Sequence, residues 1–328
     1  MPKVTLISAF YNRAAVVERT VAGLQRQTFA DFEAHLIDDA SKDGTLGELL
    51  KHASQKLLVH TQPNMGFVNT MISAIARTDS EYIAVLGSGD ECLPERLAKQ
   101  VAYLDAHPDV GVVGCHSEIV FESGGATEHW RPEVQADVKQ QLFHGNPFIH
   151  GDVMMRRSAY EQAGGYRAFF TYRQDLDLWL RISDHARLAV LPEVLYRCYK
   201  LKQSVSEDVR KLIVAMTCRD FAVYCARERL AGRPDPLQAG GPVAALMRPR
   251  SRALAEDLAY AAQRRALRGE RTDAALLVAA ALREHGGAKV RMAQVMVHLP
   301  GLVQARALVR GVKRQWAQVR PGLNTARG

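Results

Sequence analysis

The sequence lacks any long uninterrupted apolar run, and this absence excludes a conventional membrane-spanning helix. The longest obvious apolar run, residues 274–282, is much shorter than the roughly 20 residues that a helix needs to cross a bilayer. No targeting leader is visible at the N-terminus, where residues 4–8 already predict a strand. We therefore expect the protein to work on the cytoplasmic side of the membrane.

Cysteine is scarce, and the five cysteines are odd in number without any Cys-x-x-Cys pair. This pattern fits a reducing compartment. Cys218 and Cys225 fall on one face of a predicted helix, but two buried thiols explain them better than a metal site does.

Acidic residues are absent after Glu284. Eight basic residues follow it: Lys289, Arg291, Arg306, Arg310, Lys313, Arg314, Arg320 and Arg327. The net charge of +8 (43 basic minus 35 acidic residues) therefore arises wholly in this region, because residues 1–284 sum to zero. The composition of the whole chain, 47% hydrophobic and 24% charged, is typical of a globular protein. The basic character belongs to the tail and indicates nothing about catalytic chemistry.

Strand-like and helix-like segments alternate over the first two hundred residues. Strands are predicted at residues 4–8, 34–37, 57–60, 82–86 and 110–114. Helices are predicted at residues 14–27, from residue 46, at 67–76, 97–104 and 174–182. This alternation indicates an α/β fold in which a mostly parallel sheet is flanked by helices on both faces.

Past Ser206 the pattern becomes helical. Residues 209–230 predict one long helix, residues 231–249 are rich in glycine and proline, and residues 253–284 predict a helical hairpin broken near Gly269. We therefore expect a first domain of residues 1–206, a helical extension of residues 207–286, and a basic tail of residues 287–328.

The acidic pair Asp38-Asp39 follows a short buried strand, and ligands bind at such strand ends in open α/β sheets. The spacing of Thr45 and Glu48 predicts a capping box at the start of the next helix. The two carboxylates are suited to accept hydrogen bonds from a base or ribose, or to help hold a metal. An ordinary Asx turn explains the pair equally well.

Five stretches in order resemble the family 2 glycosyltransferases, which are inverting enzymes of GT-A (Rossmann-like) fold that use nucleotide sugars. They are SAFYNR at residues 8–13, LIDDASKDGT at 36–45, QPNMG at 62–66, HGDVMMRRSAYEQAGGYR at 150–167 and QDLDLWLR at 174–181. The resemblance covers residues 1 to about 200, and its second stretch is close to the family's most specific motif.

By this resemblance the nucleotide sugar, expected to be UDP-linked, lies against the first strand ends and the asparagine-glycine loop. A carboxylate would accept the N–H of the base. The implied residues are Ala9, Tyr11, Asp38, Asp39, Asn64, Gly66 and Ser88. For Tyr11, simple packing is the competing interpretation.

Asp175 matches the family's catalytic base, which takes the proton of the acceptor hydroxyl as that oxygen attacks the anomeric carbon. A solvated helix face is the competing interpretation for Asp175 and Asp177. At most one of them is expected to face the cleft, because a single residue separates them. The resemblance places His150 and Gly151 on the acceptor side. Trp179 is either a sugar-stacking platform or, as its apolar neighbours favour, a core anchor.

The chain departs from the family where the metal-binding Asp-x-Asp triplet is expected, because Gly87-Ser88-Gly89 stands there. Two glycines remove ligands that Mn²⁺ or Mg²⁺ would prefer, so the metal cofactor is in doubt. Tyr199 and Gln174 likewise replace a family histidine and glutamate. Three interpretations follow: Asp90 still helps to bind the metal, basic side chains stabilise the leaving diphosphate, or the chain binds a donor without transferring it. The basic candidates are Arg197, Lys200 and Lys202.

The tail has apolar residues every three or four positions with basic residues beside them, which predicts a basic amphipathic helix. The apolar positions are Leu302, Ala305, Val309, Val312, Trp316 and Val319. Such a helix either docks on the anionic inner face of the cell membrane, or packs on the catalytic domain or in a homodimer. Because no recognised nucleic-acid-binding module precedes it, we expect no nucleic acid partner.

Together these features predict an inverting glycosyltransferase that moves a sugar from a nucleotide donor to a saccharide or lipid-linked acceptor. The expected setting, implied by the family, is the assembly of a surface polysaccharide or glycolipid. The alternative is a catalytically degenerate scaffold that binds a nucleotide sugar at the membrane. The two hypotheses differ in whether Asp175 removes a proton from an acceptor.

Overall fold

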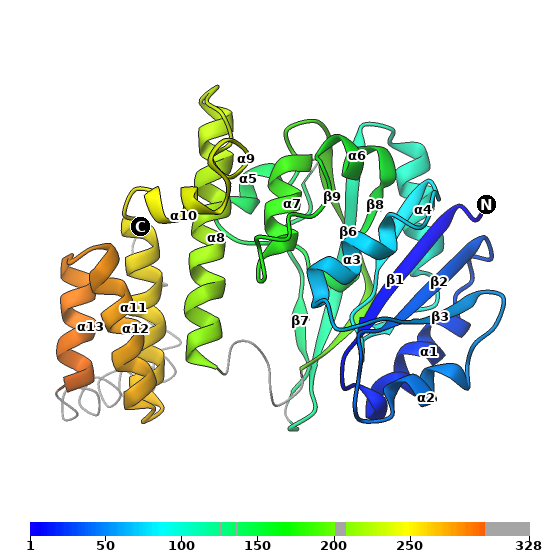
Figure 1. Ribbon diagram of the computed structural model, residues 1–328, viewed down its shortest axis with the longest axis horizontal. Helices are drawn as coiled ribbons and strands as arrows, with labels where there is room; N and C mark the ends of the chain where they lie inside the picture. Colours follow the sequence, from blue (N-terminus) through cyan, green and yellow to red (C-terminus); the bar gives the residue numbers. More distant parts are fainter. Residues whose placement is uncertain (125, 136, 201–207, 299–328) are drawn as a thin grey trace, which may run out of the picture. The chain divides into compact units, whose positions relative to one another are not determined.

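The computed structural model of the chain describes residues 1–124, 126–135, 137–200 and 208–298. These residues form two compact units (Figure 1). The first unit contains the described residues up to 200 together with residues 222–242, and the second contains residues 208–221 and 243–298. The long helix α8 (Val209–Leu230) contributes to both units. The expected domain boundaries at residues 206 and 286 stay a prediction.

The first unit is built on a sheet with strand order β3-β2-β1-β4-β8-β6-β9-β5, and β7 pairs with β6. The strands are β1 (Val4–Phe10), β2 (Phe32–Asp38), β3 (Leu57–Thr61), β4 (Tyr82–Val85), β5 (Glu91–Cys92), β6 (Val110–Phe121), β7 (Glu128–Trp130), β8 (Met154–Arg156) and β9 (Arg187–Lys200). β3, β2, β1 and β4 run parallel, as predicted, and so do β6 and β9. β8 runs antiparallel to both β4 and β6, so the sheet as a whole is mixed.

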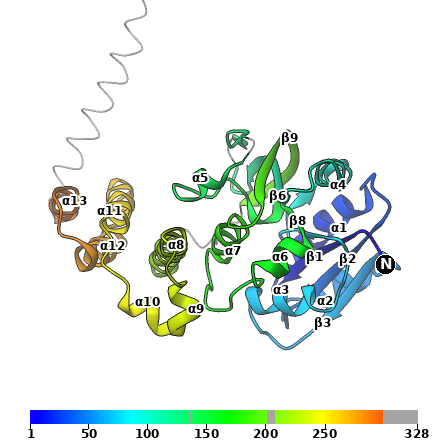
Figure 2. The same ribbon diagram turned by 90° about the horizontal axis from the view of Figure 1, so that it is seen from above.

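Helices cover both faces of this sheet, as the alternation predicts (Figure 2). α1 (Val17–Gln25), α2 (Thr45–Leu50) and α4 (Arg96–Ala106) share one apolar core with the strands. α3 (Phe67–Ile75), α6 (Arg157–Gln162) and α7 (Gln174–Ile182) lie on the opposite face. Strands β1 and β2 are buried along almost their whole length because both of their sides are covered. Three short helices complete the unit's first part: η1 (Ala14–Val16), α5 (Lys139–Leu142) and η2 (His150–Asp152).

The start of α2 differs from the prediction. Gly44, with a φ of 90°, occupies the N-cap position of the helix. Glycine has no side chain, so it cannot accept the hydrogen bond that a capping residue would accept. Asp43 Oδ1 instead accepts hydrogen bonds from the N–H of Thr45 at 3.1 Å and from its hydroxyl at 2.5 Å. The capping box predicted from Thr45 and Glu48 is therefore wrong, because Asp43 supplies the acceptor for the first turn.

The largest element that the sequence did not predict is β9, which pairs in parallel with β6 over most of its length. β6 also continues to Phe121, beyond the predicted end at residue 114. Each strand depends on a partner far away in the chain, and such pairing outweighs local propensity. This long pair matters for function because β9 carries Tyr196 to the edge of the sheet where β4 ends.

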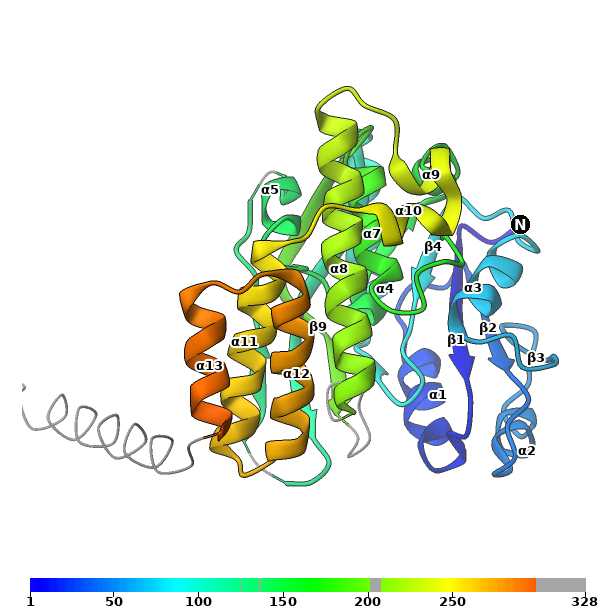
Figure 3. The same ribbon diagram turned by 60° about the vertical axis from the view of Figure 1, so that its left-hand side comes forward.

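The second unit has a small alanine-rich core formed by helices that lie side by side (Figure 3). They are α11 (Arg252–Leu267), α12 (Arg271–Glu284), α13 (Ala288–His298) and the first part of α8. Gly269, with a φ of 82°, separates α11 from α12 at the predicted break. The preceding segment, rich in glycine and proline, forms the short helices α9 (Pro236–Gly240), η3 (Gly241–Val243) and α10 (Ala244–Met247).

The amphipathic helix predicted for the tail, including Leu302 and Trp316, lies outside the described residues. Within the ranges that are described, no helix is both long enough and apolar enough to span a bilayer. The expected membrane contact and the expected homodimer stay predictions.

Candidate active site

The carboxyl ends of the parallel strands bring the predicted donor-site residues to one edge of the sheet. In the register of β1 and β2, Ala9 lies opposite Ile37, and Phe10 lies opposite Asp38. Tyr11, which directly follows β1, is 48% exposed, and packing alone does not account for so open a tyrosine. Ligands bind at this kind of edge in open α/β sheets.

Asp39 organises the asparagine-glycine loop. Its carboxylate accepts hydrogen bonds from the N–H groups of Met65 at 2.9 Å and Gly66 at 3.0 Å, and from the side chain of Gln62 at 3.0 Å. The Asn64 amide donates to the main-chain carbonyl of Asp39 at 2.9 Å. The structure therefore brings Asp39, Asn64 and Gly66 together, and it does so by bonding them to one another.

Asp38 is also occupied by the protein. Its carboxylate accepts the N–H of Ser41 at 3.3 Å and the hydroxyl of Thr61 at 3.4 Å, and only 2% of the residue is exposed. The contact with Ser41 is the local turn that competes with a purely ligand-binding interpretation of the acidic pair. Contact between either carboxylate and a nucleotide base stays a prediction.

A tight turn follows β4 at the position of the expected Asp-x-Asp triplet. The N–H of Asp90 donates to the carbonyl of Gly87 at 3.0 Å, and the half-buried Ser88 lies between the two glycines. Gly89 has a φ of 96° at the third position of this turn, a conformation that favours glycine. The Gly89 N–H donates to the hydroxyl of Thr20 at 2.8 Å, which fixes the turn to α1.

Asp90 has a protein partner on each carboxylate oxygen. The Tyr196 hydroxyl donates to Oδ2 at 2.5 Å, and the Tyr199 N–H donates to Oδ1 at 2.8 Å. Burial raises the pKa of Asp90, while these two hydrogen bonds and the positive charge of Lys200 act against that rise. The one acidic residue that directly follows the glycines is thus held between two residues of β9.

The donor set at this turn does not fit a divalent cation. Glu91, the next carboxylate, pairs with Arg26 at 2.5 Å and Arg197 at 2.8 Å. In the part of the chain that the structure describes, no three His, Cys, Asp or Glu side chains are grouped as a metal site requires. A divalent cation at a diphosphate takes one or two protein carboxylates beside phosphate oxygens and water. Of the two carboxylates at this turn, Asp90 accepts a hydrogen bond on each oxygen and Glu91 is ion-paired, so neither is free of protein partners.

The three basic residues predicted beside the leaving diphosphate have different surroundings. Arg197 donates to Glu118 and Glu91 at 2.8 Å each, which ties it to the sheet and argues against its predicted role. Lys200 is exposed at the end of β9, and its charge acts on Asp90. Lys202 lies outside the described residues.

The candidate base Asp175 occupies the first turn of α7 and is 8% exposed. The side-chain amide of Asn146 donates to Asp175 Oδ2 at 2.7 Å, and the amide oxygen accepts the N–H of Phe148 at 3.1 Å. Asn146 is therefore fixed at both ends and orients the carboxylate. The sequence does not reveal Asn146, because it lies in a segment without periodicity.

Asp177 has a different environment from Asp175, as the single residue between them leads us to expect. It is 1% exposed and forms ion pairs with Arg167 and, at 2.8 Å, with Arg181. Because both carboxylates are buried, a solvated helix face describes neither. Asp177 is held by two guanidinium groups, which suits a structural role rather than proton transfer.

Two of the three predicted acceptor-side residues, His150 and Trp179, belong to an aromatic cluster, and the third, Gly151, directly follows His150. The His150 Nε2 atom lies 2.7 Å from the Tyr166 hydroxyl, and the His150 ring meets the Trp179 ring edge-on at a centroid distance of 6.2 Å. Burial lowers the pKa of His150, and the charge of Asp175 opposes this effect. Trp179 is fully buried, which agrees with the core-anchor interpretation. A Cβ atom on residue 151 would collide with the Tyr196 hydroxyl, so glycine is the residue that fits there.

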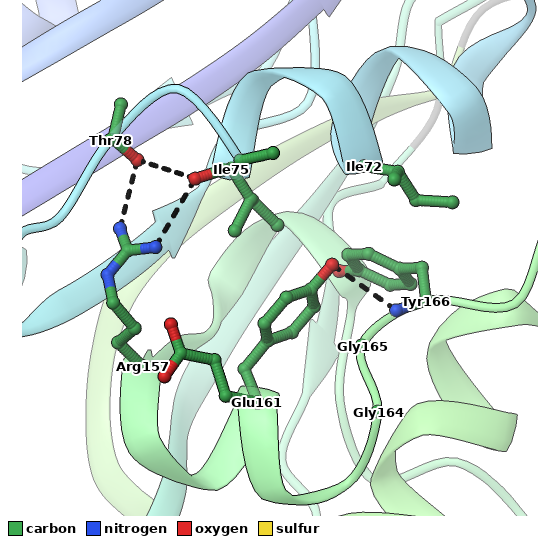
Figure 4. A pocket seen from close by; sticks show the side chains of 10 residues that line it. Ile72, Ile75, Thr78, Arg157, Glu161, Gly164, Gly165 and Tyr166 are labelled. Atoms are coloured by element: carbon green, nitrogen blue, oxygen red, sulfur yellow. Dashed lines mark hydrogen bonds between the residues drawn. The ribbon is translucent and has the colours of Figure 1, made fainter.

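A pocket of about 390 Å³ lies between α3 and α6 (Figure 4). Tyr166 connects it to the aromatic cluster, since this residue lines the pocket and its hydroxyl contacts His150. The charged Arg157 in its wall is anchored to Thr78 at 2.9 Å and to the Ile75 carbonyl at 3.3 Å. No predicted nucleotide-binding residue lines this pocket, so we do not place the donor there.

Ion pairs around two buried carboxylates, those of Asp177 and Asp235, join α7 to residues 222–242, which belong to the same unit. Arg167 links Asp177 to Asp235, with 2.9 Å between its Nη1 atom and Asp235 Oδ1. Arg229 binds the other oxygen of Asp235 at 2.7 Å and also pairs with Asp184 at 2.7 Å. We call these five residues the α7 brace. The brace fixes the helix that carries Asp175.

Comparison with known sequences gives consistent matches. The family model described as "Glycosyl transferase family 2" matches residues 5–164. "Putative glycosyltransferase EpsE" of Bacillus subtilis (strain 168) is 33% identical over 236 residues, which cover 70% of this chain and 83% of that protein. "Amylovoran biosynthesis glycosyltransferase AmsE" of Erwinia amylovora is 29% identical, with 59% of this chain and 74% of that protein covered. "O-antigen biosynthesis glycosyltransferase WbnJ" of Escherichia coli is 25% identical, with 55% and 71% covered.

Solved structures share the fold at low sequence identity. S. aureus TarS 1-349 in complex with UDP superposes with a TM-score of 0.54 at 17% identity, covering 90% of each chain. The mannosyltransferase PcManGT from Pyrobaculum calidifontis, in complex with GDP-Man and Mn²⁺, gives a TM-score of 0.54 at 18% identity and covers 94% of this chain and 86% of its own. Similarity at 17–18% identity supports the fold of this chain. The chemistry of the site has to be argued from the residues of this chain.

Proposed function

The chain belongs to glycosyl transferase family 2, and from this premise we propose that it moves a sugar from a UDP-linked donor to a saccharide or lipid-linked acceptor with inversion. The α/β fold of the first unit is that of the GT-A glycosyltransferases to which it is similar. The observation that carries the proposal is the buried Asp175 carboxylate, which Asn146 orients beside an aromatic cluster.

The reaction needs one proton transfer and one displacement. Asp175 takes the proton of an acceptor hydroxyl while that oxygen bonds to the anomeric carbon. The bond from this carbon to the diphosphate oxygen breaks on the opposite face, and the nucleoside diphosphate leaves with the electron pair. His150 and Tyr166, which contact each other at 2.7 Å, form a polar wall where the acceptor would bind.

The donor is proposed to lie along the strand ends. Tyr11 offers an open ring for stacking on the base, and Ala9 lies two residues before it at the end of β1. The loop held by Asp39 brings Asn64 and Gly66 to the same edge. The uridine preference agrees with the UDP complex of the TarS neighbour, and the proposed role in surface polysaccharide or glycolipid assembly follows the names of the AmsE and WbnJ relatives.

The glycines at positions 87 and 89 favour a second candidate, a scaffold that binds a nucleotide sugar without transferring it. Binding of nucleotide sugars and release of the nucleoside diphosphate should be measured with a panel of UDP-, GDP- and dTDP-linked donors. We expect one UDP sugar to bind and to be turned over. Binding without turnover, even with candidate acceptors, would favour the scaffold, and absence of any binding would contradict both proposals.

Tyr11→Ala is the variant that tests the donor location within this panel. Removing the ring should weaken donor binding about tenfold, because base stacking on an aromatic side chain contributes about 1–3 kcal/mol. Tyr260→Ala is the matched control, since Tyr260 is a 62% exposed tyrosine on α11 in the second unit. Equal donor affinities for the two variants would show that Tyr11 does not contact the base.

A further inference from the structure

The turn after β4 leaves little room for side chains at the two outer positions of an Asp-x-Asp triplet. A Cβ atom on Gly87 would collide with the Asp90 carboxylate and lie 3.1 Å from the Tyr196 hydroxyl. A Cβ on Gly89 would lie 3.0 Å from Val16 Cγ2, at a φ that side chains other than glycine rarely adopt. Aspartate at position 87 would therefore displace the Asp90 carboxylate from its present place, and aspartate at position 89 would strain the backbone.

The Tyr196 hydroxyl fills the space beside these glycines. It donates to Asp90 and accepts the N–H of Gly87 at 3.2 Å. Its position also requires glycine at residue 151, where a Cβ would overlap the hydroxyl. Burial raises the pKa of Tyr196 well above its ordinary value, so the hydroxyl stays protonated and remains a donor. Gly87, Gly151 and Tyr196 thus form one packing unit around Asp90.

The far end of β9 holds the turn from its other side. The Tyr199 N–H occupies the second oxygen of Asp90. Arg19 stacks over the Tyr199 ring, with 3.7 Å between its guanidinium carbon and the ring centroid, and donates to the Gly89 carbonyl at 3.0 Å. Both oxygens of Asp90 therefore accept hydrogen bonds from β9. The turn itself is hydrogen-bonded to Tyr196 through Gly87 and to Arg19 through Gly89.

We propose that this chain transfers sugar without a protein-bound divalent cation, because glycines stand at both triplet positions and Tyr196 and Tyr199 each hold one oxygen of Asp90, the acidic residue that remains there. The exposed Lys200 directly follows Tyr199, whose N–H binds Asp90, and it supplies positive charge beside the leaving diphosphate. This inference rests on the proposed glycosyl transfer and specifies how the leaving group is stabilised. It differs from the Mn²⁺ complex of the PcManGT neighbour, whose 18% identity shows the fold alone.

The first test measures metal binding independently of activity. The electron paramagnetic resonance signal of free Mn²⁺ should be followed while the full chain is added, with and without UDP. We expect the protein alone to leave the signal unchanged, and the protein with UDP to remove no more Mn²⁺ than UDP alone removes. Stoichiometric Mn²⁺ binding by the protein, or by its UDP complex beyond the UDP control, would overturn the proposal.

The second test measures donor turnover in EDTA, Mg²⁺ and Mn²⁺. We expect equal rates in all three, and Lys200→Gln should lower the rate about 10²-fold, the typical effect of removing one group that stabilises developing negative charge. Lys51→Gln is the control, because Lys51 is an exposed lysine on the turn that follows α2. Two results would overturn this inference alone: turnover that EDTA abolishes and Mn²⁺ restores, or an unchanged rate for Lys200→Gln. Absence of turnover under every condition would instead count against the proposed transfer.

Discussion

Asp175→Asn is expected to lower kcat for sugar transfer by about 10²–10⁴-fold, the usual contribution of a general base, while donor affinity stays unchanged. Asparagine has nearly the same shape as aspartate, but its amide cannot take the acceptor proton. The native carboxylate is 8% exposed and accepts a 2.7 Å hydrogen bond from Asn146, so its orientation is fixed before the acceptor binds. The measurement is steady-state kinetics with the donor and acceptor that the panel identifies.

A matched variant separates the loss of the base from a general loss of charge. Asp31→Asn changes an exposed aspartate in the turn before β2 and should leave kcat unchanged. Asn146→Ala should lower kcat less than Asp175→Asn does, since it frees the carboxylate without removing it. If Asp175→Asn kept full activity with an unchanged melting temperature, another group would have to be the base.

Arg167→Ala is expected to lower the free energy of unfolding by about 1.5–3 kcal/mol, because two buried carboxylates each lose one of their two guanidinium partners, Asp177 keeping Arg181 and Asp235 keeping Arg229. Asp177 and Asp235 expose only 1% and 2% of their side chains, so water does not replace the lost partner. The measurement is urea unfolding followed by tryptophan fluorescence, in which Trp179 reports on α7 of the first unit.

Arg233→Ala is the control for this prediction. Arg233 pairs with Glu228, but 60% of its side chain is exposed, so its loss should leave the free energy of unfolding almost unchanged. If the two variants were equally stable, the α7 brace would contribute no more than a surface ion pair. The position of Asp175 would then have to depend on the packing of α7 alone.

The sequence predicted the elements whose signals are local. The apolar runs at the start of the chain form the parallel strands β1, β2, β3 and β4, and the GT-A fold that the five motifs implied is confirmed. α7 and α8 span the predicted residues, since each carries an apolar pattern bounded by polar segments. In each case the information lies within about twenty consecutive residues.

The elements that the sequence did not predict depend on distant partners. β9 gains its ladder from β6, and its mixture of charged, aromatic and apolar residues gives no period of its own. The contact between Tyr196 and Asp90 joins residues 106 positions apart, and no spacing rule anticipates it. Asn146 likewise meets Asp175 only after the loop between α5 and η2 has folded against α7.

The candidate site was predicted more fully as a location than as a set of contacts. The sequence predicted that a nucleotide would lie against Asp39, Asn64 and Gly66. In the structure, Asn64 and Gly66 are hydrogen-bonded to Asp39. The departure at Gly87 and Gly89 was visible in the sequence, but its reason was not. The structure adds a steric reason, because a Cβ atom at position 87 would collide with the Asp90 carboxylate and one at position 89 would press on the Val16 side chain at a positive φ.

The most direct test of the central claim is the configuration of the sugar that is first released when water replaces the acceptor. Wild-type protein should be given the α-linked UDP sugar that the panel identifies, and the product should be observed by proton NMR before mutarotation. A single displacement assisted by Asp175 predicts that the β-anomer forms first, with a rate that falls in Asp175→Asn. Release of the α-anomer would contradict the account, because retention requires a different mechanism.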